Sequence, residues 1–343
     1  MKDHQAKEGG LRGRAAASLL VWSFFFVVLA FATAHGESAL KKVSFIPLWS
    51  PQAQFAGYYA AQEAGIYRKY GLDVTIIQGG PHKPSSELLE KGEADIGSIW
   101  LSTALQKRSR GVRLVNIAQI VQRSSLMLIA KKARGIRRPE DLEGKKVGLW
   151  GDDFRIQPEA FFKKYKVSVK AVPQSYSVNL FLRDGVDAAS GMWYNEYHTI
   201  LNAGINADEI TSFFYSDYGL NFPEDGIYVM EETLQKDPAM ACAFVKASME
   251  GWAYAFDHPD KAIDIVLAHM RVANVPANRV HQKWMLERMK DIIMPSGKTG
   301  GTPGLLRKED YERVGKELKA GGLIRDIPAI DVFAFGCEGH VQK

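Results

Sequence analysis

Residues 41 to 77 read KKVSFIPLWSPQAQFAGYYAAQEAGIYRKYGLDVTII, and they predict a strand, a helix and a second strand in that order. The segment 41–49 is typical of a strand, 55–71 of a helix, and 72–77 of a strand again. Strands that alternate with helices belong to parallel sheets whose two faces the helices cover. This stretch therefore predicts an α/β fold.

The helix of this stretch carries a stripe of small residues. They recur at steps of three and four: Ala53, Ala56, Gly57, Ala60, Ala61 and Ala64. A stripe with this spacing lies on one helix face and lets the helix lie close on a sheet. We expect Gly71 to end the helix in a left-handed conformation. The alternation continues with a short helix over 84–92 and strands over 94–100 and 112–121.

A second part of the chain repeats this plan. The segment KKVGLW at 145–150 echoes 41–49, and KGEADIGSIW at 91–100 shares a Gly turn, an Asp, a Ser and a closing Trp with RDGVDAASGMW at 183–193. Chance is one explanation, because both are common ways to enter a buried strand. The other explanation is two related α/β lobes, each of which ends two of its strands in tryptophan.

Four tryptophans lie at predicted strand ends: Trp49, Trp100, Trp150 and Trp193. In open α/β sheets, ligands lie beyond the carboxyl ends of the strands. If the four rings face one cleft, they form flat apolar walls on which a planar ring or a sugar can stack. The alternative for each of them is ordinary core packing.

Polar side chains follow these tryptophans. They are Gln52 and Gln54 after Trp49, Asp152 and Asp153 after Trp150, and Tyr194, Asn195, Glu196 and Tyr197 after Trp193. Amide and carboxylate groups form paired, planar hydrogen bonds with the edge of a nitrogen heterocycle. Asp152 or Asp153 can instead cap the helix expected at 157–165. Glu196 is expected just inside a helix that faces the cleft, where a buried carboxylate needs a partner.

Composition and motifs argue against several classes of function. The chain has 343 residues, 46% hydrophobic and 24% charged, and its net charge of +5 is not gathered into basic blocks with aromatics, which argues against nucleic-acid binding. No HExxH, HxH or Cys-x-x-Cys spacing occurs, so the sequence predicts no metal site. The segment 297–304 is interpreted as a surface turn, and the basic run 131–146 as a solvated face or a contact for a membrane permease.

The amino terminus has the pattern of an export signal. Four basic residues precede an apolar run over 15–34, which ends in Ala32-x-Ala34, so we expect residues 1–34 to be a signal peptide cleaved after Ala34. The alternative is an uncleaved membrane anchor, because twenty apolar residues can span a bilayer. The sequence leaves open whether Cys242 and Cys337 pair, and two buried free thiols are the simpler expectation.

Several segments resemble the solute-binding proteins of ABC transporters that are related to binders of thiamine-pyrimidine precursors. They are PLWSPQAQFAGYYAAQEAGIYRKYGLDVTI, ADIGS, SYSVNLFLRDGVDAASGMWYNEY, DYG at 217–219 and EDGIYV at 224–229. The resemblance, from about Val43 to Leu267, implies a type II periplasmic-binding-protein fold with two α/β lobes, two crossover segments and a ligand cleft. It implies one lobe at 42–125 plus 229–335 and another at 126–228, with crossovers near 123–130 and 224–230. The helices of the tail would pack on the first lobe.

The resemblance also suggests site residues. Trp49 and Gln54 match an aromatic and a polar position of the family, whose members often carry Asn and His where this chain has Gln52 and Gln54. The segment at Tyr194–Tyr197 matches the one that contacts the pyrimidine in relatives. The predicted ligand-binding residues are Trp49, Gln52, Gln54, Tyr58, Trp100, Trp150, Asp152, Asp153, Trp193, Tyr194, Asn195, Glu196 and Tyr218.

Two departures from the family count against a synthase. The phosphate-binding branch, which includes fungal pyrimidine-phosphate synthases, has a Gly-Glu-Phe-Gly loop where this chain has Gly-Asp-Asp-Phe-Arg at 151–155, and the second acid disfavours a phosphate. The cysteine cluster of the fungal enzymes is missing as well.

The sequence thus predicts a periplasmic, monomeric binding protein of an ABC importer, without enzyme activity, cofactor or metal. Its partners would be a small-molecule ligand and the membrane permease. The expected ligand is a thiamine-related aminopyrimidine. Alternatives are a flavin, a small sulfonate or nitrate anion, a pyrimidine-precursor synthase of the fungal kind, and a sensory or scaffold lobe without transport.

Overall fold

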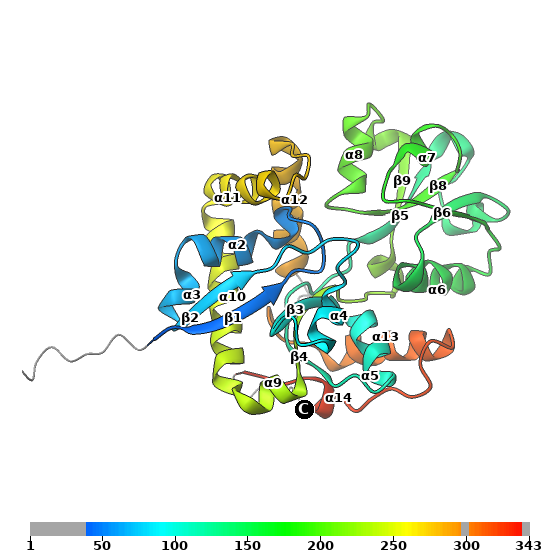
Figure 1. Ribbon diagram of the computed structural model, residues 1–343. Helices are drawn as coiled ribbons and strands as arrows, with labels where there is room; N and C mark the ends of the chain where they lie inside the picture. The colour runs from blue at the N-terminus through cyan, green and yellow to red at the C-terminus, as the bar shows by residue number, and fades with distance from the viewer. Residues whose placement is uncertain (1–38, 296–301, 338–343) are drawn as a thin grey trace, which may run out of the picture. The chain divides into compact units, whose positions relative to one another are not determined.

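Two five-stranded sheets form the framework of the residues that this computed structural model describes, which are 39–295 and 302–337 (Figure 1). The predicted signal peptide, residues 1–34, lies outside the described residues, and so does most of the segment 297–304. All of the elements below belong to the unit Leu40–Lys343.

The first sheet has the strand order β2-β1-β3-β10-β4. Its strands are β1 (Lys41–Ile46), β2 (Leu72–Ile76), β3 (Ile96–Trp100), β4 (Leu114–Gln119) and β10 (Asp225–Met230). Strands β1, β2 and β3 run parallel, whereas β10 is antiparallel to both β3 and β4. The expectation of purely parallel sheets was therefore wrong, because β10 enters this sheet directly from the other lobe and not through a covering helix.

The second sheet has the order β7-β6-β8-β5-β9. Its strands are β5 (Leu126–Lys131), β6 (Lys146–Leu149), β7 (Lys170–Pro173), β8 (Ala188–Met192) and β9 (Ile210–Phe214). Here β5 is the strand that comes from the other lobe, and it is antiparallel to β8 and β9.

The two sheets are built in the same way. Strands β6, β7 and β8 take the places of β1, β2 and β3, and β5 and β9 take those of β10 and β4. The sequence echoes fall on equivalent strands, since 145–150 contains β6 and 41–49 contains β1. The same holds for β3 and β8. The predicted repeat of the α/β plan is thus present in the topology.

Two short connections join the lobes. The first runs over 120–125, between β4 and β5, and the second over 219–224, between the 3-10 turn η6 and β10. The predicted boundary between 228 and 229 falls inside β10, all of whose residues belong to the first sheet, so that lobe resumes at Asp225. The segment 126–130, predicted as crossover, is strand β5.

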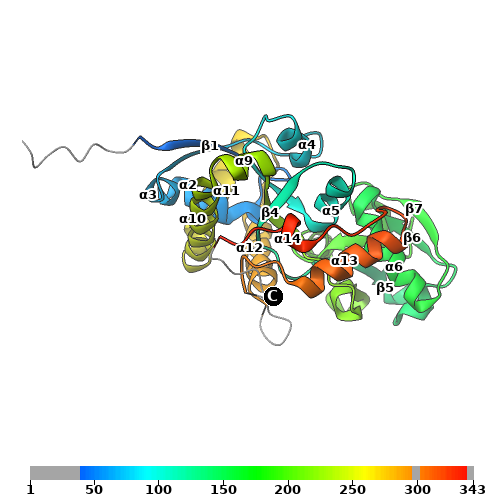
Figure 2. The ribbon, with the colours of Figure 1, turned by 90° about the horizontal axis from the view of Figure 1, so that it is seen from below.

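The helices surround both sheets (Figures 1 and 2). Those beside the first sheet are α2 (Ala56–Glu63), α3 (Ile66–Lys69), α4 (Ser85–Glu90), α5 (Leu101–Ser109), α9 (Glu231–Lys236), α10 (Pro238–Asp257), α11 (Pro259–Val272), α12 (Arg279–Ile293), α13 (Lys308–Ala320) and α14 (Ile330–Phe333). Those of the second lobe are α6 (Ile156–Tyr165), α7 (Asn179–Leu182) and α8 (Glu196–Asn202). Figure 2 shows α13 beside α5 and α6, and it contacts both.

Short 3-10 helices complete the description. They are η1 (Ala53–Phe55), η2 (Lys132–Arg134), η3 (Pro139–Leu142), η4 (Asp152–Arg155), η5 (Ala207–Glu209) and η6 (Tyr215–Tyr218). Gly71 adopts a φ of +77°, which confirms the predicted left-handed end of the first helical stretch. A membrane-spanning helix needs both length and apolarity, and no helix within the described ranges combines the two.

The stripe of small residues on α2 faces another helix. A Cβ added at Gly57 would clash with the Trp252 ring on α10, and one added at Gly251 would clash with the carbonyl oxygen of Gly57. The stripe therefore serves close packing of α2 on α10, where the sequence suggested close packing on a sheet. Small residues permit close approach to any neighbour, and sequence spacing does not say which.

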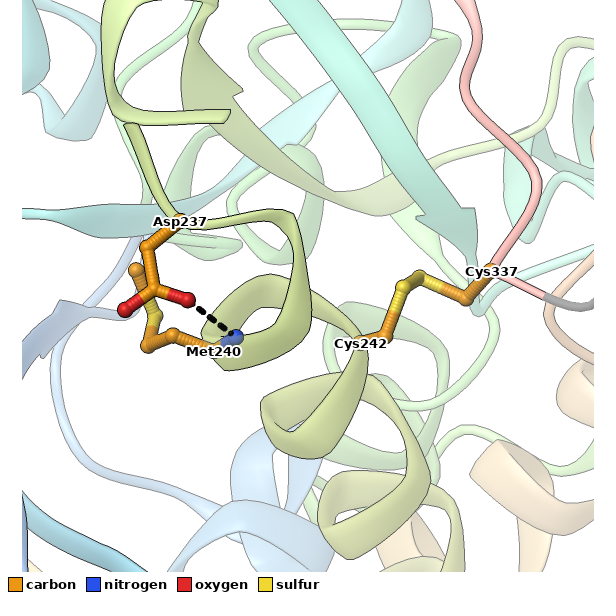
Figure 3. Close-up of a disulfide and its surroundings, with 4 residues drawn as sticks. All are labelled: Asp237, Met240, Cys242 and Cys337. Atoms are coloured by element: carbon orange, nitrogen blue, oxygen red, sulfur yellow. Dashed lines mark hydrogen bonds between the residues drawn. A yellow bond between two sulfur atoms is a disulfide. The ribbon is translucent and has the colours of Figure 1, made fainter. Parts of the chain in front are cut away.

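The tail returns to the first lobe, as predicted. Helix α10 contacts α2, α3 and β4, and the side chain of Asp237 caps it by accepting a hydrogen bond from Met240 N at 2.9 Å. Cys242 of α10 forms a disulfide with Cys337, with a Cα–Cα distance of 5.2 Å (Figure 3). The expectation of two free thiols was wrong, because the fold brings together residues that lie 95 positions apart.

Candidate functional site

A cavity of about 170 Å³ lies between the two lobes. In the first lobe the lining residues follow β1 or end β3, and in the second lobe they follow β6 or β7, or they end or follow β8. The lining residues are Leu48, Trp49, Gln52, Gln54, Trp100, Trp150, Phe154, Tyr176, Met192, Tyr194, Asn195 and Glu196. The cavity thus lies where the carboxyl ends of parallel strands from both sheets meet, as expected for open α/β sheets.

Aromatic rings from the two lobes touch across this cavity. Trp49 of the first lobe meets Tyr176 of the second edge to face, with centroids 4.8 Å apart. Trp100 of the first lobe meets Phe154 of the second in the same manner at 4.7 Å. Phe154 also contacts Trp150, whose indole Nε1 donates to the carbonyl oxygen of Ser175 at 3.1 Å. These rings supply flat apolar walls from both sides.

The polar edge of the first lobe is a chain of amides that ends on an acid. Gln52 Nε2 donates to Gln54 Oε1 at 2.6 Å, and Gln54 Nε2 donates to Asp225 Oδ2 at 2.9 Å. The backbone N–H of Ala53, between the two glutamines, donates to Gln282 Oε1 at 2.7 Å. Gln54 is buried, and its amide orientation is fixed by a donor on one side and an acceptor on the other.

Asp225 lies behind Gln54 and outside the cavity lining. Burial raises the pKa of Asp225 to about 7. The hydrogen bond from Gln54 and the nearby indole N–H of Trp100 both lower this pKa and so oppose the rise. The indole N–H of Trp100 does not itself have the geometry of a hydrogen bond to Asp225. The second carboxylate oxygen, Oδ1, is buried without a partner among the described residues. Neutrality of Asp225 lowers the cost of that arrangement.

The polar edge of the second lobe carries its acid in the lining itself. Glu196 is the first residue of α8, and its Oε2 accepts from Met192 N at 2.9 Å. Its Oε1 accepts from Asn195 Nδ2, also at 2.9 Å. Burial raises the pKa of Glu196 to about 7, although these hydrogen bonds favour the charged form. Near neutral pH the group can therefore either accept or donate a proton toward a ligand.

A third buried acid, Glu224, lies in the second crossover segment, and its carboxyl group binds residues at the first crossover segment. Its Oε1 accepts from Ser125 N at 2.6 Å and from Leu126 N at 3.2 Å, and the hydroxyls of Ser124 and Ser125 donate to the same carboxyl group. Burial raises the pKa of Glu224 to about 8, and the charge of Asp225 adds to the rise. Glu224 thereby ties the two connections between the lobes to each other, and Asn221 does so as well, since its Oδ1 accepts from Ser124 N and its Nδ2 donates to Gln122 O.

Tyr194 lies in the cavity lining close to these acids. Burial raises the pKa of its hydroxyl, and the negative charges of Glu224, Asp225 and Glu196 raise it further. Tyr194 is therefore neutral at physiological pH and keeps its hydroxyl hydrogen. Among the described residues that line the cavity there is no Lys, Arg or His side chain, so their charged groups are acidic only.

Three predicted site residues lie away from the cavity. Tyr58 is packed inside the first lobe between Phe45 and Trp252, with centroids 4.6 and 5.8 Å away. Tyr218 packs on α6 against Phe161 at 5.0 Å. The expectation that four tryptophans share one cleft is corrected to three, because Trp193 does not line it.

Trp193 misses the cavity for a simple geometric reason. Strand β8 ends at Met192, which lines the cavity, and successive side chains of an extended chain point to opposite sides. The Trp193 ring instead packs on Phe214 at 5.5 Å and under the Arg288 guanidinium at 4.9 Å. The other predicted acids, Asp152 and Asp153, form part of η4, and their side chains lie outside what the structure describes.

Four lining residues were not predicted from the sequence: Leu48, Phe154, Tyr176 and Met192. Leu48 and Met192 each precede a tryptophan that had been selected, so inspection of both neighbours of each strand end would have found them. Phe154 lies in the loop at 151–155 that was compared with phosphate binders, but only its acids were considered. Tyr176 had no local signal, because its partner Trp49 lies in the other lobe. Among the described residues, no cluster of three or more His, Cys, Asp or Glu side chains is placed to hold a metal ion.

The chain is similar to known binding proteins. The sequence pattern of the family described as NMT1/THI5 like matches residues 52–262, more than half of the chain. The formylaminopyrimidine-binding protein of Halalkalibacterium halodurans is 24% identical over 92% of this chain and 97% of its own length. The riboflavin-binding protein RibY of Chloroflexus aurantiacus is also 24% identical, over 84% of each chain.

A solved structure supports the fold assignment. The periplasmic aliphatic sulphonate binding protein SsuA from Escherichia coli matches with a TM-score of 0.65 and 14% identity, over 86% of this chain and 92% of that chain. At this identity the likeness concerns the fold. The predicted two-lobed periplasmic-binding-protein fold is thereby confirmed.

Proposed function

Because the chain belongs to the NMT1/THI5-like family, we propose that it is an exported solute-binding protein that carries a single-ring nitrogen heterocycle, an aminopyrimidine, to an ABC importer. One observation carries the proposal. A small cavity with aromatic walls from both lobes has an amide edge on one side and a carboxyl edge on the other.

The size of the cavity favours one ring. An apolar cavity of about 150 Å³ holds benzene, and the cavity between the lobes has about 170 Å³. A substituted six-membered ring therefore fits this arrangement of the lobes, whereas the three fused rings of a flavin require a wider opening. For this reason we propose an aminopyrimidine as the ligand and keep riboflavin as the alternative.

The polar edges suit the edge of an aminopyrimidine. An amino group beside a ring nitrogen offers donors next to an acceptor. Gln52 uses one amide hydrogen on Gln54, which leaves its other amide hydrogen and its carbonyl oxygen for a ligand. Each Glu196 oxygen accepts one hydrogen bond from the protein and has a second lone pair. We propose that Glu196 accepts from the amino group or donates to the ring nitrogen.

The charge of the lining disfavours anions. A sulfonate or nitrate needs cationic side chains or clustered backbone N–H donors. The lining, as far as the structure describes the chain, has no cationic side chain and includes the acid Glu196, with Asp225 behind it. A small anion is therefore a poor match for this cavity.

The proposal includes export and a permease but no catalysis. The basic and apolar pattern at 1–34 supports export with cleavage after Ala34. Two of the relatives that match along most of the chain are named as binding proteins, which supports a carrier over a synthase. We propose that the carrier acts as a monomer. The permease would bind the closed form of the lobes.

Thermal unfolding and calorimetry with a panel of ligands test the proposal. The panel contains 4-amino-5-hydroxymethyl-2-methylpyrimidine, riboflavin, taurine and nitrate. A ligand at a hundred times its Kd adds about 2.7 kcal/mol to the stability, and we expect this for the pyrimidine alone. Stabilisation only by the anions, or only by riboflavin, would overturn the ligand assignment. Glu159→Gln on α6, an exposed acid, is the control variant and should bind like the wild type.

A further inference from the structure

The first turn of α12 holds both polar edges of the cavity. Gln282 Oε1 accepts from Ala53 N at 2.7 Å, between the two glutamines of the first lobe. The preceding residue, His281, has its Nε2 2.9 Å from Oδ1 of Asn195 in the second lobe. Neighbouring residues of one helix thus reach the two sides of the cavity.

The other end of α12 is attached to the first crossover. The carbonyl oxygen of Ile292 accepts from the backbone N–H groups of Gln122 and Arg123, at 3.0 and 3.2 Å. Helix α12 has 15 residues, and at 1.5 Å per residue it spans about 22 Å. It therefore connects the segment about which the lobes move with the polar edge of the cavity.

The hydrogen-bond directions along this contact are fixed by chemistry. Asn195 Nδ2 is a donor and gives its hydrogen to Glu196 Oε1, so Asn195 Oδ1 is the acceptor of the pair with His281. His281 must carry its hydrogen on Nε2, and in the neutral ring Nδ1 is then an acceptor. His198 of α8 lies with its Nδ1 2.8 Å from this atom and supplies the hydrogen, which requires that the Asn202 amide, 3.2 Å from the same His198 Nδ1, turns its oxygen toward it.

Packing holds the two imidazoles in this geometry. His198 stacks on Trp284 at 4.8 Å and on His281 at 5.1 Å. The Trp284 indole donates to the carbonyl oxygen of Trp193 at 3.1 Å, and Arg288 lies over the Trp284 ring at 4.6 Å. The two stacking contacts of His198 and the bond to Trp193 join α12 of the first lobe to α8 and the residue after β8 in the second, whereas the Arg288–Trp284 contact lies within α12.

We propose that His281 is a positioning residue that latches the closed lobes: it reaches across from α12, fixes the amide of Asn195 and so aims Glu196 at the ligand. The proposal deepens the proposed function and, for its effect on ligand affinity, rests on it. Gln282 makes its bond within the first lobe and persists when the lobes open, whereas the bond of His281 exists only when they are closed.

The latch gives ligand binding a pH dependence in acid. Burial lowers the pKa of His281 to about 4, and the charge of His198 adds to the effect. Burial also lowers the pKa of His198. The charged side chains on the packed elements are Glu196 of α8, Arg279, Lys283, Glu287, Arg288, Lys290 and Asp291 of α12, and Asp260, Lys261, Asp264 and Arg271 of α11. Asp260 and Asp264 pair with Arg279 and Lys283.

The sign of this dependence follows from linkage. An imidazole exposed in the open form has a pKa near 6.5, so the closed form binds fewer protons. The contribution of the latch to affinity is complete above about pH 6.5 and is lost as the pH falls toward 4. Glu196 also titrates over this pH range. Because every variant compared below contains Glu196, its effect cancels in the ratio of the affinities of two variants at the same pH.

Three variants test the latch. His281→Ala removes the hydrogen bond, His281→Gln keeps an N–H donor that can reach Asn195, and Lys283→Ala removes an exposed charge from the same turn of α12 as control. We expect His281→Ala to weaken binding of 4-amino-5-hydroxymethyl-2-methylpyrimidine about tenfold at pH 7.5, mainly through faster dissociation. His281→Gln should recover most of this loss. The affinity of the wild type should fall between pH 6.5 and 5 relative to that of His281→Gln, because glutamine does not titrate.

A measurement without ligand separates this proposal from the proposed function. In small-angle X-ray scattering, ligand-free His281→Ala should have a larger radius of gyration than the wild type and His281→Gln, because its lobes open more often. Equal radii for all variants would overturn the latch even if the pyrimidine binds. Absence of pyrimidine binding by the wild type would overturn the function alone. If His281→Ala fails to fold, nitrogen NMR of the wild-type imidazoles decides: hydrogen on Nδ1 of His281 at pH 7.5 contradicts the proposal.

Discussion

The two lobes share one sheet order, yet they place their acids differently at the cavity. In the first lobe, Asp225 lies behind Gln54, so an amide and not the acid faces the cavity. In the second lobe, Glu196 itself lines the cavity. Burial raises the pKa of both carboxyls to about 7. Equivalent frameworks therefore present a neutral edge on one side and a titratable edge on the other.

The lobes also differ in how their elements are tied together. The disulfide between Cys242 and Cys337 joins α10 to the C-terminal segment beside β4, where Phe335 N donates to Asn116 O at 2.8 Å. Both cysteines of the chain are used in the first lobe, so the second lobe depends on packing and hydrogen bonds. The covalent constraint lies in the lobe that also holds α12.

The largest effect should come from removing that constraint. Cys242→Ser with Cys337→Ser opens a loop of 95 residues, and loop-closure entropy predicts a loss of about 4 to 5 kcal/mol of unfolding free energy. Denaturant unfolding under non-reducing conditions measures it, with the wild type in reductant as the matched state. Ligand affinity at temperatures where the variant is folded should stay within about threefold. A loss below 1 kcal/mol contradicts the prediction.

The next effect concerns the second-lobe acid. Glu196→Ala should weaken aminopyrimidine binding about a hundredfold, because a buried, charge-assisted partner is worth about 2 to 5 kcal/mol when truncated. Glu196→Gln keeps the shape but replaces one acceptor oxygen by a donor, and about a tenfold loss is expected. Titration calorimetry at pH 7.5 gives both values, with Glu159→Gln as control. Wild-type affinity in Glu196→Ala would remove Glu196 from the proposed site.

A third effect is the pH dependence of stability. The pKa values of Glu196, Asp225 and Glu224 rise from ordinary values of 4.5, 3.8 and 4.5 to about 7, 7 and 8. The folded state thus holds more protons than the unfolded state. The contribution of these three groups to the free energy of unfolding is complete below about pH 4 and is lost as the pH rises toward 8.

Each group contributes a slope of at most about 1.4 kcal/mol per pH unit. Between about pH 7.5 and 8.5 an imidazole with a pKa near 6.5 is almost wholly neutral in the unfolded state as well as in the folded state, so the histidine latch does not interfere. We expect the denaturation midpoint to fall over this range and the fall to be smaller in Glu224→Gln. A midpoint that rises over the same range is the contrary result.

The smallest effect sharpens the comparison between the lobes. Asp225→Asn keeps an acceptor for Gln54 but removes the charge. Since the ligand would meet Gln54 and not Asp225, affinity should change less than threefold, well below the change in Glu196→Gln. Paired calorimetry of the two variants checks this. Equal losses in both would mean that the first-lobe acid acts directly on the ligand.

Much of the fold could be predicted from local patterns. Hydrophobic segments and glycine positions placed most strands and the first helix within a few residues, and the echo between 41–49 and 145–150 indicated two related lobes. The direction of β10 and β5 could not be predicted, because it depends on how the chain passes between lobes. The same limit applies to the boundary at Asp225.

The candidate site divides in the same manner. Tryptophans at strand ends led to Trp49, Trp100 and Trp150, and the polar residues beside them led to Gln52, Gln54 and Glu196. Trp193 was misplaced because a one-residue step in an extended chain reverses the side chain. Asp225, Glu224, His281 and Gln282 gave no local signal, because their partners lie elsewhere in the chain.

The sequence by itself determined the alternation of strands and helices, the doubling of that plan and the chemical character of the strand ends. These features depend on contacts between near neighbours in the chain. Only the tertiary structure decided which side chains face one another across the lobes, which acids lose their solvent, and that Cys242 meets Cys337. Such pairings depend on distances between remote segments, and residue periodicity carries no record of them.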